Sequence, residues 1–235
     1  MTDLASLTWT ETADHARSAP TLAVPVGATE QHGPHLPMST DTDIAVALAE
    51  KLATKMRDVV VAPAVAYGSS GEHQGFPGTL SIGQEAVELL LMELVRSACL
   101  TFSYVVLITT HGGNAQPVVR VVRRLRDEGR KVLAWSPNWA GDAHAGRTET
   151  SLMLALAPHQ VRLHAAQAGN TTPINDLLPR LRHEGLASVT ANGVLGDPTG
   201  ATAEEGALLL ECATAELTKR VAEHRRRVCA VPGDR

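Results

Sequence analysis

Short apolar runs alternate along this chain with longer segments in which apolar residues recur at helical spacing. The runs, rich in β-branched residues, predict strands at 22–28, 59–65, 104–109 and 132–135. The helical spacing predicts helices at 43–56, 84–100, 117–129, 148–157 and 203–224. Strands that alternate with helices form a mainly parallel sheet covered on both faces. The pattern therefore predicts an α/β fold, a three-layer α/β/α sandwich.

One long segment fits neither pattern. Residues 67–83 contain five glycines and Pro77, which is too broken for a helix or a strand. Loops of this length inside a folded domain are usually functional. The whole chain of 235 residues, 44% of them hydrophobic, can bury one substantial core, so we expect a single domain over 1–235.

Charge and composition exclude several classes of partner. The formal net charge is −4, with acids and bases interspersed, and the one basic run, 225–227, suits the end of the last helix. We therefore expect no nucleic-acid partner. No apolar stretch approaches the ~20 residues that span a bilayer, and the first residues lack a signal-peptide pattern. We expect no membrane association, a cytoplasmic protein and three reduced cysteines, Cys99, Cys212 and Cys229, that bind no metal.

Polar side chains follow three of the predicted strands. Glu30 and His32 leave the first strand, His111 and Asn114 leave the strand at 104–109, and a loop from Trp139 to Glu149 follows a later one. In a parallel sheet the loops at the carboxyl ends of the strands meet at one edge, where ligands bind. We therefore expect these residues to share one site, with Asn114 and Trp139 contacting the substrate.

Taken singly, these residues have structural explanations. Asp41, at the entry of the helix at 43–56, could equally be its N-cap. His32 could be a hydrogen-bonded loop imidazole, and Glu149 could be a first-turn carboxylate that the helix dipole stabilises.

Taken together, they form a ligand set. Glu30, His32, Asp41, His111 and Glu149 supply two imidazoles and three carboxylates without a thiolate, a set suited to zinc, manganese or ferrous iron. A bridging carboxylate could hold two ions about 3.5–4 Å apart, an arrangement that activates water. The sequence therefore predicts two divalent metal ions per chain and hydrolytic chemistry.

Further histidines could take part. His144 could stay off the metals and carry a proton to a departing amide nitrogen, although its spacing fits a ligand or a surface residue equally well. Glu72 and His73 could face the pocket, but one such pair favours a structural role. The chain has no phosphate-binding loop, no dinucleotide fingerprint and no G-x-S-x-G motif, which disfavours nucleotide-dependent and serine-nucleophile chemistry.

Four motifs resemble those of the creatininase family, in the family's order. They are VGATEQHGPHLP at 26–37 with Asp41 after it, AYGSSGEH at 66–73, HGGN at 111–114 and HAGRTETS at 144–151. The resemblance covers most of the chain and implies a creatininase-like sandwich that forms a homo-oligomer.

The resemblance also implies roles for individual residues. Glu30, Asp41 and His111 would hold one metal ion, while His32 and the shared Asp41 would hold the other. Creatininase has a glutamate at the place of Gly113, so we assign the missing carboxylate to Glu149. His144 matches the family's catalytic histidine. Creatininase has a further glutamate at the place of Ala143, which argues against creatinine as the substrate.

Motifs at 66–73, 193–198 and 202–206 are most similar to the branch of this family that acts in the mycofactocin system. This similarity implies a peptidase that removes a C-terminal Val-Tyr dipeptide from the modified precursor peptide of that redox cofactor. Two alternatives stay open at this point. One is an amidohydrolase of a small cyclic amide or formamide, and the other is a non-catalytic metal-binding assembly protein.

Overall fold

The sheet of this protein is parallel throughout and has the strand order β1-β3-β2-β4-β5. We describe it from a computed structural model, which describes residues 2–18, 20–139 and 141–229. The strands are β1 (Thr2–Asp3), β2 (Thr21–Val26), β3 (Val59–Val61), β4 (Tyr104–Thr109) and β5 (Val132–Trp135). Both central strands, β2 and β4, are buried along their whole length, as continuous apolar runs require.

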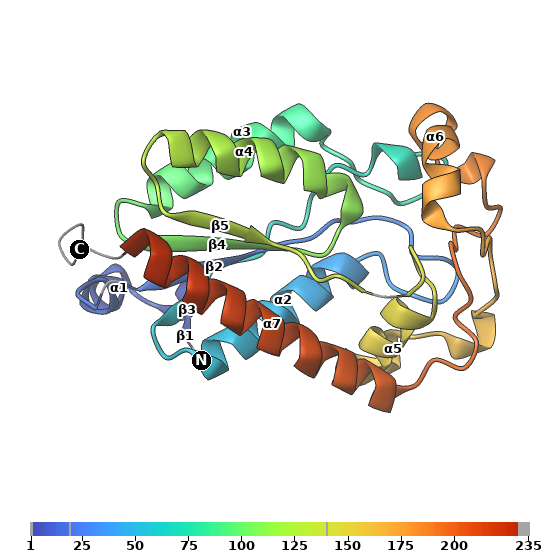
Figure 1. The fold of residues 1–235 in the computed structure, drawn as a ribbon. Helices are drawn as coiled ribbons and strands as arrows, with labels where there is room; N and C mark the ends of the chain where they lie inside the picture. The colour runs from blue at the N-terminus through green and yellow to red at the C-terminus, as the bar shows by residue number, and fades with distance from the viewer. Residues whose placement is uncertain (1, 19, 140, 230–235) are drawn as a thin grey trace.

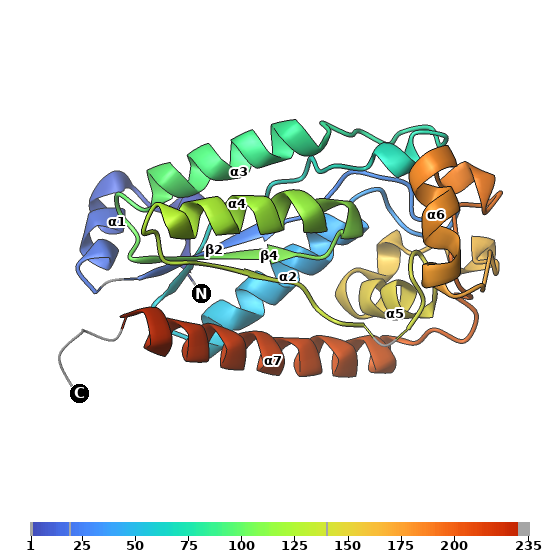
Figure 2. The same ribbon diagram turned by 45° about the horizontal axis from the view of Figure 1, so that its top comes forward.

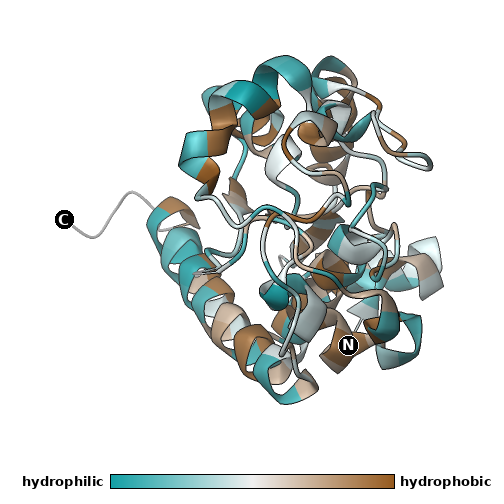
Figure 3. Cartoon of the chain, turned by 90° about the vertical axis from the view of Figure 1, so that its right-hand side faces the viewer, coloured by the Kyte–Doolittle hydropathy of each residue, from teal (hydrophilic) through white to brown (hydrophobic). Residues whose placement is uncertain are grey.

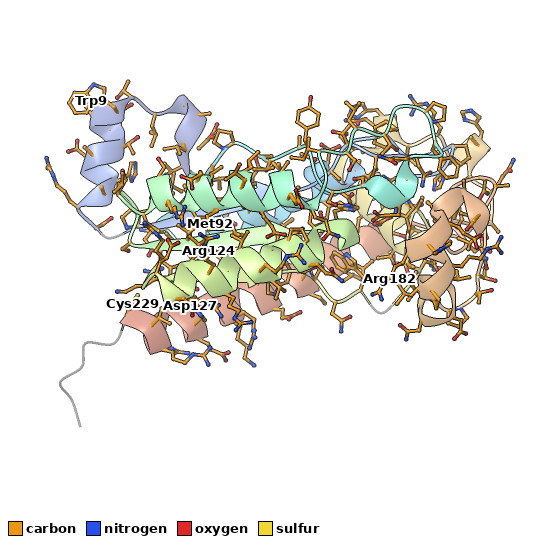
Figure 4. The ribbon with its side chains drawn as sticks, turned by 90° about the horizontal axis from the view of Figure 1, so that it is seen from above. Trp9, Met92, Arg124, Asp127, Arg182 and Cys229 are labelled. Atoms are coloured by element: carbon orange, nitrogen blue, oxygen red, sulfur yellow. The ribbon has the colours of Figure 1, made fainter. Side chains whose placement is uncertain are left out.

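Helices cover both faces of the sheet (Figure 1). On one face lie α3 (Gln84–Ala98) and α4 (Ala115–Asp127), side by side in the view from above (Figure 4). On the other lie α2 (Thr40–Lys55), α5 (Arg147–Leu156) and α7 (Ala203–Cys229), seen below the sheet in Figure 2. Each face has its own buried apolar cluster. The three-layer α/β/α prediction is confirmed.

Proline residues lie within or just after two of the strands, β2 and β3. The strand predicted at 22–28 contains Pro25, and β2 continues through this proline to Val26, paired with β4 on one side. The predicted strand at 59–65 ends earlier, at Val61, because Pro63 follows and cannot donate to the ladder. Pairing resumes at Val65, whose N–H donates to Pro25 O at 2.9 Å.

Two helices were not predicted. A short helix, α1 (Trp9–Ala16), begins with a capping box between Thr8 and Glu11 and buries no residue, so no apolar stripe marks it. The other, α6 (Ile174–Glu184), contains Pro179 and lies beyond the carboxyl ends of the strands (Figures 1 and 2). It packs through Leu177 and Leu181 in a small apolar cluster of its own.

Short 3-10 turns complete the fold. They are η1 (Leu4–Ser6), η2 (Gly71–His73), η3 (Gly112–Asn114), η4 (Pro158–Gln160), η5 (Leu163–Ala165) and η6 (Leu186–Ser188). No helix in the described part of the chain is long and apolar enough to cross a membrane.

The close approach of α5 and α7 yields a stability prediction. A Cβ added at Gly206 would lie 1.8 Å from Ser151 O, because α7 crosses α5 in backbone contact. We expect Gly206→Ala to lower the free energy of unfolding by about 1–3 kcal/mol, the usual cost of overpacking. Thermal and denaturant unfolding would measure it. The control is Leu208→Ala on the exposed face of α7, expected to change stability by less than about 0.5 kcal/mol. An equal effect of both variants would contradict the contact.

Candidate metal centre

The residues predicted to bind metal come together at the carboxyl ends of β2 and β4. Figure 3 looks onto this end of the molecule, where the loops that follow the strands cross between the helical layers. Glu30 and His32 follow β2, and His111 follows β4. Asp41 lies in the first turn of α2, whose N-cap is Ser39. The N-cap alternative for Asp41 is therefore wrong, and its carboxylate is free to face the site.

Two groups of ligand atoms share Asp41. On one side His111 Nδ1 lies 3.2 Å from Glu30 Oε1 and 3.4 Å from Asp41 Oδ2. On the other, His32 Nε2 lies 3.6 Å from Asp41 Oδ1 and 3.8 Å from Glu149 Oε2. Each oxygen of Asp41 thus faces a different imidazole. This is the arrangement that a carboxylate shared by two ions requires.

Backbone carbonyls orient the two imidazoles. The Nε2–H of His111 donates to Ser69 O at 2.8 Å, which leaves Nδ1 directed at Glu30 and Asp41. The Nδ1–H of His32 donates to Glu30 O at 3.2 Å, which leaves its Nε2 directed at Asp41 and Glu149. Hydrogen bonds of this kind to the far nitrogen are the usual support of metal-binding histidines.

Buried polar atoms at the site lack partners. Among the described residues, both carboxylate oxygens of Glu30, His32 Nε2 and Asp41 Oδ2 make no hydrogen bond of acceptable geometry, although imidazole nitrogens lie within 4 Å. Glu30 is fully buried and Asp41 is 2% exposed. Orphaned buried atoms are rare in proteins. Since these atoms converge and are all N or O donors, the residues fit divalent cations.

The imidazoles hold protons while no cation is bound. Burial alone would lower the pKa of His32, but the carboxylates of Asp41, Glu149 and Glu30 outweigh it and raise the pKa to about 10. His111 is likewise buried, and Glu30 and Asp41 raise its pKa to about 10. In turn the charged imidazoles hold the pKa of Asp41 well below its ordinary value, against the effect of burial.

Glu149 and His144 reach the site from one loop. Ala145, between them, has φ +52°, a left-handed conformation that is uncommon for a residue with a side chain. Its N–H donates to Glu149 Oε2 at 2.5 Å, so the carboxylate is held at the start of α5. His144 pairs with Leu195 by two backbone hydrogen bonds. Its Nδ1 lies 3.9 Å from Glu30 Oε1.

Gly113 does not leave an empty place beside His111. A Cβ there would lie 2.1 Å from Ser69 O and 2.7 Å from Glu72 Oε1. The loop at 69–72 therefore fills this space, on the Nε2 side of His111 and away from the Nδ1 that faces the ligands. Burial raises the pKa of the Glu72 carboxyl. The observed place of Glu149 beside His32 supports its assignment as the fifth ligand.

Two residues predicted to contact substrate make contacts within the protein. The buried side chain of Asn114 accepts from Ser69 N at 3.0 Å and donates to Gly27 O at 2.9 Å, which ties three loops together. Trp139 is half-buried and packs against the cluster beneath α5 and α7. Substrate binding by Asn114 and Trp139 stays a prediction.

From the sequence we did not identify Gln31 as a site residue and favoured a structural role for His73. Both residues are nevertheless buried at the site. His73 Nε2 lies 3.4 Å from Glu30 Oε1, and Gln31 Nε2 lies 3.1 Å from His73 Nδ1. Glu30, His73 and His144 form a further group that could hold a metal ion. The one signal in the sequence was the glycine-rich stretch at 67–83, which marked the loop without showing which residue turns inward.

A cavity of about 750 Å³ is lined by two of the predicted metal ligands, Glu30 and His111. Its floor includes Glu30, His73, His111 and His144, and one wall, formed by α6 and the turn after it, combines apolar side chains with Arg182, His183 and Glu184. The apolar residues of that wall are Ile174, Leu178, Leu181 and Leu186. Cavities of this size hold small molecules or short peptide segments.

Comparison with known proteins shows which proteins this chain is similar to. The family described as creatinine amidohydrolase matches residues 5–221. The chain is 52% identical over 194 residues to the mycofactocin precursor peptide peptidase of Mycolicibacterium smegmatis, covering 80% of this chain and 78% of the relative. A manganese form of creatininase superposes with a TM-score of 0.79 at 27% identity, covering 94% of this chain and 97% of that one. A creatininase variant in a Zn–Zn form has a TM-score of 0.79 at 26% identity, with the same coverage.

Asp41 offers the most direct test of the centre. An amide in place of the carboxylate keeps only one acceptor and turns an N–H₂ group toward an imidazole, so we expect Asp41→Asn to lose both metal ions and at least ~99% of the hydrolytic activity. Metal analysis and assay would measure the two losses. The matched control is Asp43→Asn in the same helical turn, whose carboxylate accepts from Ser39 Oγ at 2.8 Å. Retention of metal by Asp41→Asn would contradict the shared-ligand geometry.

Metal uptake should release protons. Both imidazole pKa values are raised to about 10, so both groups are charged at neutral pH in the metal-free protein and must lose a proton to bind a cation. We expect release of about two protons per chain near pH 7.5, and an apparent affinity that rises with pH up to about 10. Zinc titration in buffers of different ionisation enthalpy would count the protons. Uptake without proton release would show that the imidazoles are neutral before binding.

Proposed function

The chain belongs to the creatininase family, and we propose that it is a metal-dependent peptidase that cuts a C-terminal dipeptide from the modified mycofactocin precursor peptide. The observation that supports the proposal is the cavity itself, which is lined by Glu30 and His111 and by apolar side chains of α6. Those apolar side chains suit a Val-Tyr end better than they suit a small polar ring. The 52% identity to a peptidase of this name supports the same substrate.

The residues divide the work of amide hydrolysis. Glu30, Asp41 and His111 would hold one divalent cation, and His32, Asp41 and Glu149 a second. Two cations at such a site polarise a carbonyl and generate a nucleophile from water at neutral pH. Zinc, manganese and ferrous iron all suit this ligand set.

His144 would move the proton. Burial, together with the nearby charge of His32, lowers the pKa of His144 to about 4, so its imidazole is neutral. It lines the cavity, and its Nδ1 points toward Glu30. A neutral imidazole here can accept a proton at Nδ1 and pass it to the leaving nitrogen of the amide.

Two positions at which creatininase has a glutamate, 143 and 113, lack one here, and this argues for the longer substrate. Position 143, beside the proton-carrying histidine, is an alanine that lines the cavity and offers no charge to a small polar ring. At position 113 a glutamate could not replace the glycine without displacing the loop at 69–72. We expect the chain to act as a homo-oligomer in the cytoplasm, and both statements stay predictions.

Product analysis tests the function. Zinc- or manganese-loaded protein is incubated in parallel with the modified precursor peptide, with creatinine and with a formamide, and mass spectrometry identifies the products. We expect release of the modified C-terminal dipeptide alone, with Asp41→Asn as the inactive control. Turnover of creatinine or the formamide without peptide cleavage would favour the small-amide alternative. Bound metal without any hydrolysis would favour the assembly protein.

A further inference from the structure

The side chain of Gln31 contacts two imidazoles of the site and is held by backbone at both ends. Its Oε1 accepts from Gly33 N at 2.9 Å, and its Nε2 donates to Gly193 O at 3.0 Å. A flipped amide would set N–H against N–H at Gly33 and oxygen against oxygen at Gly193. The orientation of the amide is therefore fixed by backbone groups.

The two glycines are needed for this close approach. A Cβ at Gly193 would lie 1.9 Å from Gln31 Oε1, and Gly193 has φ +78°. Gly33 has φ +66°, so both residues adopt a left-handed conformation that favours glycine. Two glycines with positive φ are thus needed to place one buried amide.

Counting donors and acceptors around Gln31 gives one solution. Gly193 O takes one hydrogen of the amide, and the other is left for His73 Nδ1 at 3.1 Å or His144 Nε2 at 3.0 Å. His144 Nε2 also lies 2.9 Å from Gln31 O, which can only accept. If Nε2 of His144 donates to that carbonyl, the second amide hydrogen serves His73 Nδ1 and each of these groups has a partner; the two donor nitrogens, Gln31 Nε2 and His144 Nε2, then direct their hydrogens to different acceptors. The opposite choice, in which the amide donates to His144 Nε2, leaves Gln31 O unpaired and His73 Nδ1 without a donor.

We propose that Gln31 is a positioning residue that fixes His73 and His144 in tautomers which present opposite groups to the cavity. His144 carries its proton on Nε2 and presents the Nδ1 lone pair, 3.9 Å from Glu30 Oε1. His73 accepts from Gln31 on Nδ1 and presents Nε2–H, 3.4 Å from the same oxygen. The site thus gains one neutral imidazole that accepts a proton and a second that donates a hydrogen bond beside it.

This inference deepens the proposed function and assigns a role to His73. An acceptor at His144 is the form needed to take a proton during hydrolysis. A fixed N–H at His73 can donate a hydrogen bond to a carbonyl oxygen in the cavity, since His73 and His144 both line it. Their ring centroids are 4.6 Å apart, so one bound amide can reach both.

The test reads the tautomers directly. Zinc-loaded protein labelled with ¹⁵N-histidine, without substrate, gives two-bond ¹H–¹⁵N correlations that separate Nδ1–H from Nε2–H. Loss of peaks in His73→Asn and His144→Asn assigns the signals. We expect Nε2–H for both residues. Nδ1–H at His144, or rapid exchange between tautomers at either residue, would overturn the proposal even if no variant of Gln31 folds.

Gln31→Glu supplies the perturbation. The carboxylate keeps the size of the side chain but cannot donate to His73 Nδ1, so the His73 signal should change to Nδ1–H. We expect kcat for peptide cleavage to fall by about 10–100-fold with KM changed less than about threefold, and metal content unchanged. The matched control is Gln167→Glu, an exposed glutamine outside the cavity that makes the same charge change.

The outcomes separate the two proposals. An unchanged His73 signal or an unchanged kcat in Gln31→Glu overturns the positioning role. A wild-type protein that cleaves no peptide contradicts the proposed function, while the tautomer spectra still decide the inference on Gln31.

Discussion

Two buried carboxylates, Glu30 and Asp41, impose the constraint on which the site depends. A buried carboxylate is costly unless a cation or several hydrogen-bond donors face it. Here the described neighbours are imidazoles, none of which donates to Glu30 with good geometry. In the absence of metal, two of them, His32 and His111, take up protons, as their raised pKa values indicate. A divalent cation relieves the same charge without the protons, so folding and metal binding favour the same arrangement.

The order of the sheet meets this constraint. Glu30 and His32 follow β2, and His111 follows β4. These two strands are neighbours in the sheet although almost 80 residues separate them in the chain. Asp41 reaches the same point because α2 starts just after the loop that follows β2. A buried parallel pair at the centre of the sheet thus brings the first three ligands together, and both helical layers protect it from water.

This part of the structure could be predicted from sequence. Apolar runs marked the central strands, and polar residues directly after a parallel strand must lie at its carboxyl end. The same argument could not find Gln31 or His73. Gln31 has no chemical signature of its own, and its role depends on Gly33 and Gly193, which are 160 residues apart. His73 stands in a loop without periodicity, where no pattern tells which side chain turns inward. Helix α6 was not predicted because it contains Pro179 and buries only two leucines, too few to give a helical apolar pattern.

The wall of the cavity is built separately from its floor. The ligands rest on the two large apolar clusters around the sheet, whereas α6 and the turn after it depend on a small cluster that includes Leu177, Leu186 and Leu195. Arg182 lies on the side of α6 that faces α4 (Figure 4), at the lip of the cavity. Because few contacts join the wall to the sheet, substitutions in 174–188 can change which amide fits without moving a ligand. Separation of this kind would allow this chain and a creatininase with which it shares 27% identity and a TM-score of 0.79 to keep the same metal chemistry and act on different substrates, as the proposed function requires.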